Sequence, residues 1–554
     1  MSTSAPAIVI PDGFRLHTEN TTHLLMSEDE AFLNPVQEFN RDLSTACIRV
    51  WSEEFNRIKE ERWRRSYIAK AAKKQGKGNN KTTVGSSLSN TAPQTEDVTM
   101  EAENGFPAEV PIPPYKPSQF TILEALSATG LRSIRYAKEI PLVKYVIAND
   151  LSPAAVEAMK RNVEINGLAG EKDNEESWKV RVNEGDACSL MYQHREEKKR
   201  VDVVDLDPYG TAAPFIDASV QVPGLFFSNY GGLPVKAEYC HEAALRLLLH
   251  TLTTSASRYG RYIEPLLCLS IDFYIRVFVR VHTSPIEVKK ALPKNSTFYI
   301  CTTCQSYHEQ PLGKMVAKAS GPDGKNVNYL FKTQAGPLVP EKCTECASPF
   351  HIAGPMWSGS LHDPDFVGKV LQHVKDNESS YGTAGRMKGM LTLAKEELDE
   401  KFYFTPSKVA SFFHCTTPSL DDVASALLNA GYRVSRSHAC PGSLKTNAAR
   451  TVVYDIFRAW IKNNPVKMEK ISASSPAQKL LAKETTMVVD FSRHSDTVGA
   501  RETVKLVRYQ DNPPNWGPKR KAGPAQKKQE PVLKRKREDD EEQEEERATK
   551  QPSI

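Results

Sequence analysis

The sequence predicts an α/β protein built on a doubly wound parallel sheet, followed by an α+β domain that holds a cysteine knuckle. Strand-like and helix-like segments alternate from Phe120 to Gly210, which is typical of a parallel sheet covered by helices. Acidic residues follow three successive strand-like segments, at the edge where such sheets bind ligands. Two Cys-x-x-Cys pairs lie beyond residue 300. A chain of 554 residues is long enough for two or three domains.

The strands of the sheet follow one another along the chain. Each is a run of β-branched and other apolar residues that ends in a small-residue turn or a helix start. Ser152-Pro153, for example, places an N-cap residue before a proline, which favours the first turn of a helix. The expected strands are Phe120–Leu126, Tyr145–Asp150, Val180–Ala187 and the run that starts at Val201.

The composition indicates where the domains begin and end. We expect a first domain over residues 14–282, a second over 283–509 and a largely disordered, charged tail over 510–554. Residues 70–117 are rich in Lys, Gly, Asn, Ser, Thr and Pro and cannot bury enough apolar surface to fold, so they are predicted to be a disordered insertion. In the second domain we expect helices over 395–403 and 420–430 and a strand over 432–438.

The stretch Val201-Asp-Val-Val-Asp-Leu-Asp-Pro-Tyr-Gly210 carries the clearest chemistry. A buried strand brings acids into a Pro-Tyr-Gly turn at the carboxyl edge of the sheet. There Asp207 can accept hydrogen bonds from an exocyclic amine, the Pro208 segment offers carbonyls, and Tyr209 can stack on a ring. These three residues are therefore candidates for catalysis and substrate binding. The alternative is an acidic strand end that only caps the next helix.

The loop that ends at Gly130 indicates a nucleoside cofactor. Asp150 lies twenty residues beyond Gly130, the spacing at which an acid meets ribose hydroxyls. The loop has a single glycine, whereas a dinucleotide site needs several close backbone approaches to the pyrophosphate. S-adenosylmethionine fits better, with Asp150 at the ribose and Asp186 and Ala187 at the adenine. Taken singly, each acid is equally explained as a helix N-cap.

The cysteines predict a metal site. Cys301 and Cys304 form one knuckle and Cys343 and Cys346 the other, about forty residues further on. Four thiolates make a closed tetrahedral zinc site, which is structural because no coordination position stays open. Four unrelated buried thiols are the alternative. The other six cysteines are scattered, which favours a reducing compartment over a disulfide framework.

Composition also limits the location of the protein. No apolar run approaches the roughly 20 residues that span a bilayer, and residues 1–13 lack a basic stretch followed by an apolar one, so neither a membrane protein nor a signal peptide is expected. Near the other end, Lys534-Arg-Lys-Arg537 precedes an acidic run. This cluster is either a nuclear import signal, a nucleic-acid contact or part of a solvated tail.

At this point the sequence resembles the tRNA guanine-26 N2-dimethyltransferase family. The resemblance implies a Rossmann-like methyltransferase domain with a family-specific C-terminal domain. It also implies that Arg41, Arg132, Asp150, Asp186 and Ala187 contact S-adenosylmethionine and that Asp207 is catalytic. The alternative for Arg132 is that it is a surface arginine on the helix after the first strand, with no contact to the cofactor. The matching stretches are Asn34–Asp42, Glu124–Arg132, Asp205–Asp217, His241–Arg246, Ser270–Phe278, the four cysteines, Gly354–Gly359 and Leu444–Asn447.

One stretch departs from the family pattern. Relatives have a fifth strand and a loop before a Tyr-Gly-Gly-Leu-Pro segment, but here the chain passes from Gln221 almost directly to Tyr230–Pro234. On the order of two dozen residues are missing by this resemblance, and removing a central strand leaves ladder groups unpaired or forces them to re-pair. The sheet is thus expected to lack one strand, through either an error in the gene structure or a real loss with a damaged site.

These observations predict an S-adenosylmethionine-dependent enzyme that methylates the exocyclic N2 of guanine 26 in tRNA. The alternative is a catalytically impaired tRNA-binding or folding protein, and a DNA amino-methyltransferase is a third reading that the C-terminal matches oppose. We expect tRNA as partner, no membrane and no obligate protein partner. The expected location is the nucleus, with mitochondrion or cytoplasm as alternatives. Expected tRNA contacts are the basic residues of the second domain, among them Arg433, Arg436, His438 and Lys445. The alternatives are that these are ordinary solvated charges, or that the RNA lies along the basic segment Arg57 to Lys74.

Overall fold

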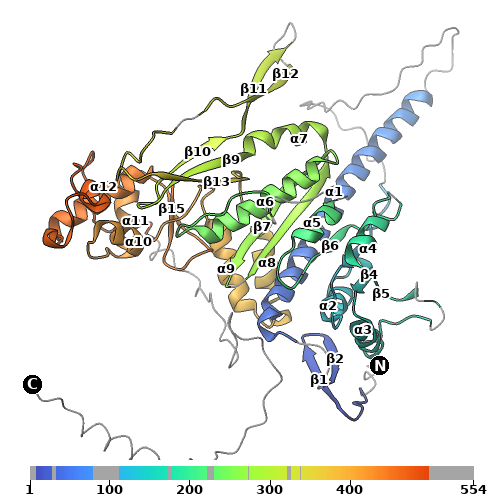
Figure 1. Ribbon diagram of the computed structural model, residues 1–554. Helices are drawn as coiled ribbons and strands as arrows, with labels where there is room; N and C mark the ends of the chain where they lie inside the picture. Colours follow the sequence, from blue (N-terminus) through green and yellow to red (C-terminus); the bar gives the residue numbers. More distant parts are fainter. Residues whose placement is uncertain are drawn as a thin grey trace, which may run out of the picture. The chain divides into compact units, whose positions relative to one another are not determined.

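The computed structural model describes residues 8–27, 33–78, 112–171, 174, 177–196, 198–220, 230–272, 274–320, 326–336 and 339–497. All of them lie within the compact unit Met1–Gln510 (Figure 1). The basic cluster at 534–537 and the acidic tail lie outside the described residues, so the expectations for them stay predictions. None of the described helices is both long and apolar enough to cross a membrane.

The described chain starts with a hairpin and a long helix. Strands β1 (Phe14–Glu19) and β2 (Thr22–Ser27) pair antiparallel, and a 3-10 turn, η1 (Pro35–Gln37), leads into α1 (Glu38–Gly78). The first turns of α1 bury Phe39 and Leu43 in the core. Because α1 continues to Gly78, residues 70–78 are helical, in contrast to the disordered insertion predicted over 70–117. Residues 79–111 lie outside the described residues.

A four-stranded parallel sheet in the order β5-β4-β3-β6 forms the centre of the first half. Alternate residues face opposite sides: Ile122 and Val146 pack with α2 and α3, whereas Leu123 and Ile147 pack with α4 and α5. Helices on both faces confirm the doubly wound sheet that the sequence predicts. The bounds are β3 (Phe120–Glu124), α2 (Leu131–Glu139), β4 (Val143–Asp150), α3 (Pro153–Ile165), β5 (Val180–Glu184), α4 (Ala187–Gln193), β6 (Val203–Asp205) and α5 (Ala213–Val220).

Within the described residues, no strand pairs with the outer edge of β6. Strands β7 (Arg261–Ile271) and β8 (Tyr274–Thr283) form a separate antiparallel pair, on which α6 (Cys240–Ser257) packs. This arrangement is what the shortened segment after Gln221 leads us to expect, although residues 221–229 themselves lie outside the described part. Strand β8 is joined to β6 by a contact between side chains, Arg276 and Asp205, and not by backbone hydrogen bonds between the two strands.

The second half contains a three-stranded antiparallel sheet in the order β10-β9-β13 and a separate hairpin, β11–β12. In Figure 1 this hairpin stands apart from the other strands. The bounds are α7 (Pro285–Lys290), η3 (Leu292–Lys294), β9 (Asn295–Cys301), β10 (Tyr307–Pro311), β11 (Gly313–Ser320), β12 (Asn326–Thr333) and β13 (Phe350–Trp357).

Helices complete the described chain. α8 (Pro364–Asp376) and α9 (Ala384–Glu396) share the core of α1 and β7, whereas the later helices surround Phe413 and Phe457. The helix predicted over 395–403 is wrong: α9 ends at Glu396, and Glu397 enters a buried polar network. The helix over 420–430 is confirmed by α11, whereas of the strand predicted over 432–438 only the three residues of β14 are a strand. The bounds are η4 (Glu378–Ser380), α10 (Pro406–Phe413), α11 (Leu420–Asn429), β14 (Val434–Arg436), β15 (Leu444–Thr446), α12 (Arg450–Asn463), η5 (Met468–Lys470) and α13 (Pro476–Leu481).

Candidate active site and metal centre

The carboxyl ends of β3 and β4 are tied together by Asp150. Its Oδ2 accepts a hydrogen bond from the Ala128 N–H at 2.9 Å, and its Oδ1 accepts one from the Ser152 N–H at 3.0 Å. The turn after β3 uses two left-handed residues, Ala128 (φ 48°) and Gly130 (φ 78°), before α2 begins. A substituent at Gly130 would also lie 3.1 Å from the side chain of Met159, so this close approach favours glycine.

The end of β5 supplies the next acid of this edge. Asp186 is the N-cap of α4 and accepts from the Ser189 N–H at 2.7 Å, while Ala187 is buried as the first residue of that helix. Leu151 is exposed beside Asp150. Two carboxylates with small and apolar neighbours at one edge suit the hydroxyls and the ring of a nucleoside, so these residues fit S-adenosylmethionine.

Two arginines and two aspartates meet at the end of β6. Arg132 donates to Asp205 at 3.1 Å and to Asp207 at 2.5 Å. Arg276 of β8 donates to Asp205 at 2.7 Å, and its Nη1 lies 3.9 Å from Asp207. The Tyr136 hydroxyl also donates to Asp205, at 2.6 Å. Asp205 therefore holds both guanidinium groups, and these in turn hold Asp207.

The two aspartates differ in exposure. Burial disfavours charge on Asp205, but the guanidinium groups of Arg276 and Arg132 outweigh it and hold the pKa of this carboxyl well below its usual value. The Asp207 side chain is 38% exposed, whereas that of Asp205 is 6% exposed. Asp207 is thus the acid that a substrate can reach. Its neighbour Tyr209 is 85% exposed, and Pro208 is half-buried, so both lie at the open end of the cluster.

Arg276 is the residue whose role the sequence did not reveal. It lies within a stretch that matches the family, but nothing in the pattern separates it from an outward-facing arginine. The feature of the sequence that could have indicated this role is that Arg276 is the one charged residue in the apolar and aromatic stretch Tyr274–Phe278, with which β8 begins. Its partner lies 71 residues away in the sequence, on β6.

Arg41 lies in a second, adjoining cluster. It pairs with Glu19 through two nitrogens, at 2.7 and 2.5 Å. Glu19 also accepts from Arg135 at 2.9 Å, and Arg135 binds Asp42 at 2.7 Å. The structure therefore brings Arg132, Asp205 and Asp207 together, whereas the side chain of Arg41 bonds to Glu19 and to the Asn34 carbonyl. Contact between Arg41 and a cofactor remains a prediction.

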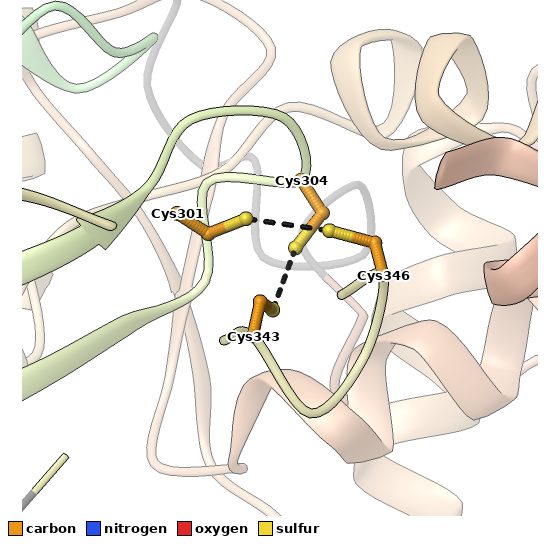
Figure 2. Close-up of side chains that lie close together, drawn as sticks. All are labelled: Cys301, Cys304, Cys343 and Cys346. Carbon is orange, nitrogen blue, oxygen red and sulfur yellow. Dashed lines mark hydrogen bonds between the residues drawn. The ribbon is translucent and has the colours of Figure 1, made fainter. Parts of the chain in front are cut away.

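Figure 2 shows the four predicted zinc ligands converging. All four are buried, and their Sγ atoms lie within 4.8 Å of one another. The Sγ atoms of Cys301 and Cys346 are 3.3 Å apart, and those of Cys304 and Cys343 are 3.6 Å apart. No disulfide joins them. Four buried thiols at this spacing fit a tetrahedral zinc ion, with the turn after β9 supplying one pair and the loop before β13 the other.

The expected tRNA contacts at His438 and Lys445 are wrong. Both side chains are buried, at 2% and 1% exposure. The Lys445 ammonium lies 2.9 Å from Glu397 and 3.2 Å from Glu242. The sequence predicts a short strand with basic side chains, which resembles an RNA-binding surface. In the structure, His438 and Lys445 instead pair with Glu397 and Glu242, which lie on segments that no sequence pattern places beside this strand. Arg433 is exposed, and its contact with tRNA stays a prediction.

Comparisons with known proteins agree with this fold. The structure of Trm1 from Pyrococcus horikoshii with S-adenosyl-L-methionine is similar over 80% of this chain and 99% of its own, with a TM-score of 0.56 and 20% identity. At that identity the likeness shows the fold alone, which is a Rossmann-like α/β fold.

Sequence relatives define the family. The profile described as N2,N2-dimethylguanosine tRNA methyltransferase matches residues 13–224 and 222–458. The tRNA (guanine(26)-N(2))-dimethyltransferase of Schizosaccharomyces pombe is 41% identical, with 89% of this chain and 90% of the relative covered. That of Mus musculus is also 41% identical, with 90% and 76% covered. The chain belongs to the N2,N2-dimethylguanosine tRNA methyltransferase family. The profile match divides at residues 222–224, where the family's fifth strand was expected to be missing.

Proposed function

We propose that this protein transfers methyl groups from S-adenosylmethionine to the exocyclic N2 of guanine 26 in tRNA. The observation that carries the proposal is the partly exposed Asp207 carboxylate, held between Arg132 and Arg276 at the edge where Asp150 and Asp186 also lie. Membership of the family supports the reaction and its substrate. The comparisons give no support to the alternative of an impaired binding protein, or to methylation of DNA.

The cofactor supplies an electrophilic methyl group when bound, and the residues of this chain bind and orient it. Asp150 would accept hydrogen bonds from the ribose, and Asp186 and Ala187 would lie at the adenine. An arginine fork suits the methionine carboxylate, and Arg132 is in place beside Asp207. Arg41 is the second candidate for that carboxylate, although Glu19 occupies it in this structure.

The target amine is a weak nucleophile because its lone pair is conjugated with the guanine ring. Asp207 would accept one N–H and turn the lone pair toward the methyl group. It would take up the proton as the new N–C bond forms, while the methyl C–S bond of the cofactor breaks and its sulfur leaves as a neutral thioether. The guanine must leave its stack to reach the site, at a cost of a few kcal/mol. The exposed Tyr209 ring and the carbonyl of Pro208 would then hold the base.

The test is methyl transfer from labelled S-adenosylmethionine to unmodified tRNA, with the product nucleoside identified. Asp207→Asn keeps the size of the side chain but removes its basicity, so the rate constant should fall by about 10²–10⁴-fold. Cofactor affinity should change little. Asp399→Asn, at an exposed position outside the site, is the matched control and should keep the wild-type rate. A near wild-type rate in Asp207→Asn would remove Asp207 from its role, and a wild-type protein that binds tRNA without methylating it would establish the binding-protein alternative.

The metal and the location belong to the same proposal. The four cysteines would hold a zinc ion that stabilises the second half of the chain without touching the substrate. The Saccharomyces cerevisiae relative, 38% identical, is named as mitochondrial. For this chain we keep the nucleus, on the basic cluster Lys534–Arg537, with the mitochondrion as the second location. A fluorescent fusion with and without Lys534–Arg537 distinguishes the two.

A further inference from the structure

The second half of α1 is a strongly basic helix that the proposed function does not yet use. Beyond Glu61 the sequence has seven Lys and Arg residues and no acidic residue before the helix ends at Gly78. In Figure 1 this end of α1 stands apart from the other labelled elements.

The helix has two distinct faces. Trp63, Tyr67 and Ala71, spaced four residues apart, are partly buried, and the Trp63 ring lies 5.7 Å from Tyr115. The exposed remainder of the helix surface carries Arg62 and Arg65 on the far side and Lys70 beside Trp63, and we call these three residues the basic stripe.

The basic stripe has no internal partner. Arg57 pairs with Glu61 at 2.5 Å and Arg64 with Glu60 at 2.7 Å, both along the same helix. In contrast, the three members of the basic stripe form no hydrogen bond or ion pair with any residue in the described part of the chain. Their positive charges are therefore available to a ligand outside the protein.

The same helix connects the basic stripe to the active site. The Ser44 hydroxyl near its start lies 2.6 Å from Arg276 Nη2, and Arg276 binds Asp205. At about 1.5 Å per residue, Arg62 lies about 27 Å along the axis from Ser44. A ligand that bridges the site and the basic stripe must therefore be long and carry negative charge at the end that meets the stripe.

We propose that the basic stripe binds the phosphate backbone of a tRNA arm away from the methylated guanine. This inference rests on the proposed function. Folded RNA is recognised mainly through phosphates and shape, and exposed Lys and Arg side chains suit that contact. A membrane surface fits less well, because amphipathic helices bind bilayers through an apolar face and here Trp63 packs against Tyr115.

The experiment compares tRNA binding by the full chain and by Arg62→Gln/Arg65→Gln/Lys70→Gln over a range of salt concentrations. Loss of three phosphate contacts should weaken binding by about tenfold or more at low salt and reduce the slope of log K against log salt by about two to three. The rate constant for methylation at saturating tRNA should not change, because no member of the stripe lies at the site, whereas KM should rise.

The control is Arg195→Gln/Lys198→Gln/Arg200→Gln, which removes the same charge at exposed positions on the α4–β6 connection. It should leave affinity and slope within about twofold of wild type, as expected for surface charges outside the contact. Equal effects in both variants, or no effect in the first, would overturn the inference. So would unchanged tRNA binding with a loss of binding to anionic lipid vesicles. If the wild-type protein binds tRNA through the stripe but never methylates it, the proposed function fails and the inference stands.

Discussion

At the scale of single residues, the structure distinguishes acids that the sequence leaves equivalent. Asp205 and Asp207 lie two residues apart in one acidic stretch, yet Asp205 takes hydrogen bonds from Arg132, Arg276 and Tyr136 and is buried. Asp207 shares the guanidinium of Arg132 and stays partly exposed. Asp205 therefore holds the two guanidinium groups in place, whereas the Asp207 carboxylate is available to react with a substrate.

Glu124 gives the site a pH dependence of stability. It ends β3, is 3% exposed, and accepts from the Ser133 hydroxyl at 2.5 Å. Burial and the neighbouring Asp205 raise its pKa to about 7, although Arg132 opposes the shift. Because the folded protein then holds a proton that the unfolded chain releases near pH 4.5, the unfolding free energy should fall as pH rises from about 4.5 to 7, by about 3 kcal/mol in total.

Glu124→Gln removes this titration and keeps an acceptor for Ser133. We expect the variant to match the wild type near pH 4.5 and to become progressively more stable than it by pH 8, because only the wild type then buries a carboxylate beside Asp205. Urea unfolding at pH 5, 6, 7 and 8, followed by circular dichroism, measures the difference. Parallel stability curves for the two proteins would show that Glu124 does not titrate in this window.

At the scale of elements, local patterns predict well and long-range partners do not. The four parallel strands, α11 and the cysteine knuckles were all predictable, because apolar periodicity and ligand spacing lie within one short stretch. The end of α9 and the place of Arg276 were not. Glu397 leaves the helix to meet Lys445, and Arg276 meets Asp205 across unpaired strands, so both depend on partners from distant segments.

The cysteine knuckles carry a prediction at this scale. Cys343→Ser removes one of four ligands, and the protein should lose its zinc and unfold at a lower temperature, because metal affinity contributes folding free energy. Zinc content by mass spectrometry and a thermal scan measure both effects, and methylation should fall only as the folded fraction falls. Cys240→Ser, an exposed cysteine outside the cluster, should retain zinc. Full zinc occupancy in Cys343→Ser would rule out the four-cysteine site.

At the scale of the whole described unit, a buried polar network joins the two expected domains. Glu242 and Arg246 of α6 pair at 2.8 Å, and Lys445 links Glu242 to Glu397. His438 binds Glu397 through Nδ1 at 2.6 Å and accepts from the Ser270 N–H of β7 through Nε2 at 3.2 Å. These contacts cross residue 282, and the division of the chain there stays a prediction. They hold the second half of the chain against the elements that carry Arg276.

Lys445→Met tests whether this network stabilises the molecule rather than binding RNA. Although burial disfavours its charge, the carboxylates of Glu242 and Glu397 raise the pKa of Lys445, so both acids depend on it for neutralisation. Removing one partner of a buried ion pair should cost about 3–5 kcal/mol of unfolding free energy. The exposed Arg433→Met should cost no more than about 0.5 kcal/mol. The salt dependence of tRNA binding, measured below the unfolding temperature, should be the same in Lys445→Met and wild type. If Lys445→Met were as stable as the wild type and bound tRNA with a reduced salt slope, Lys445 would lie at the RNA surface. The buried network of Lys445, Glu242 and Glu397 would then not be present in the protein in solution.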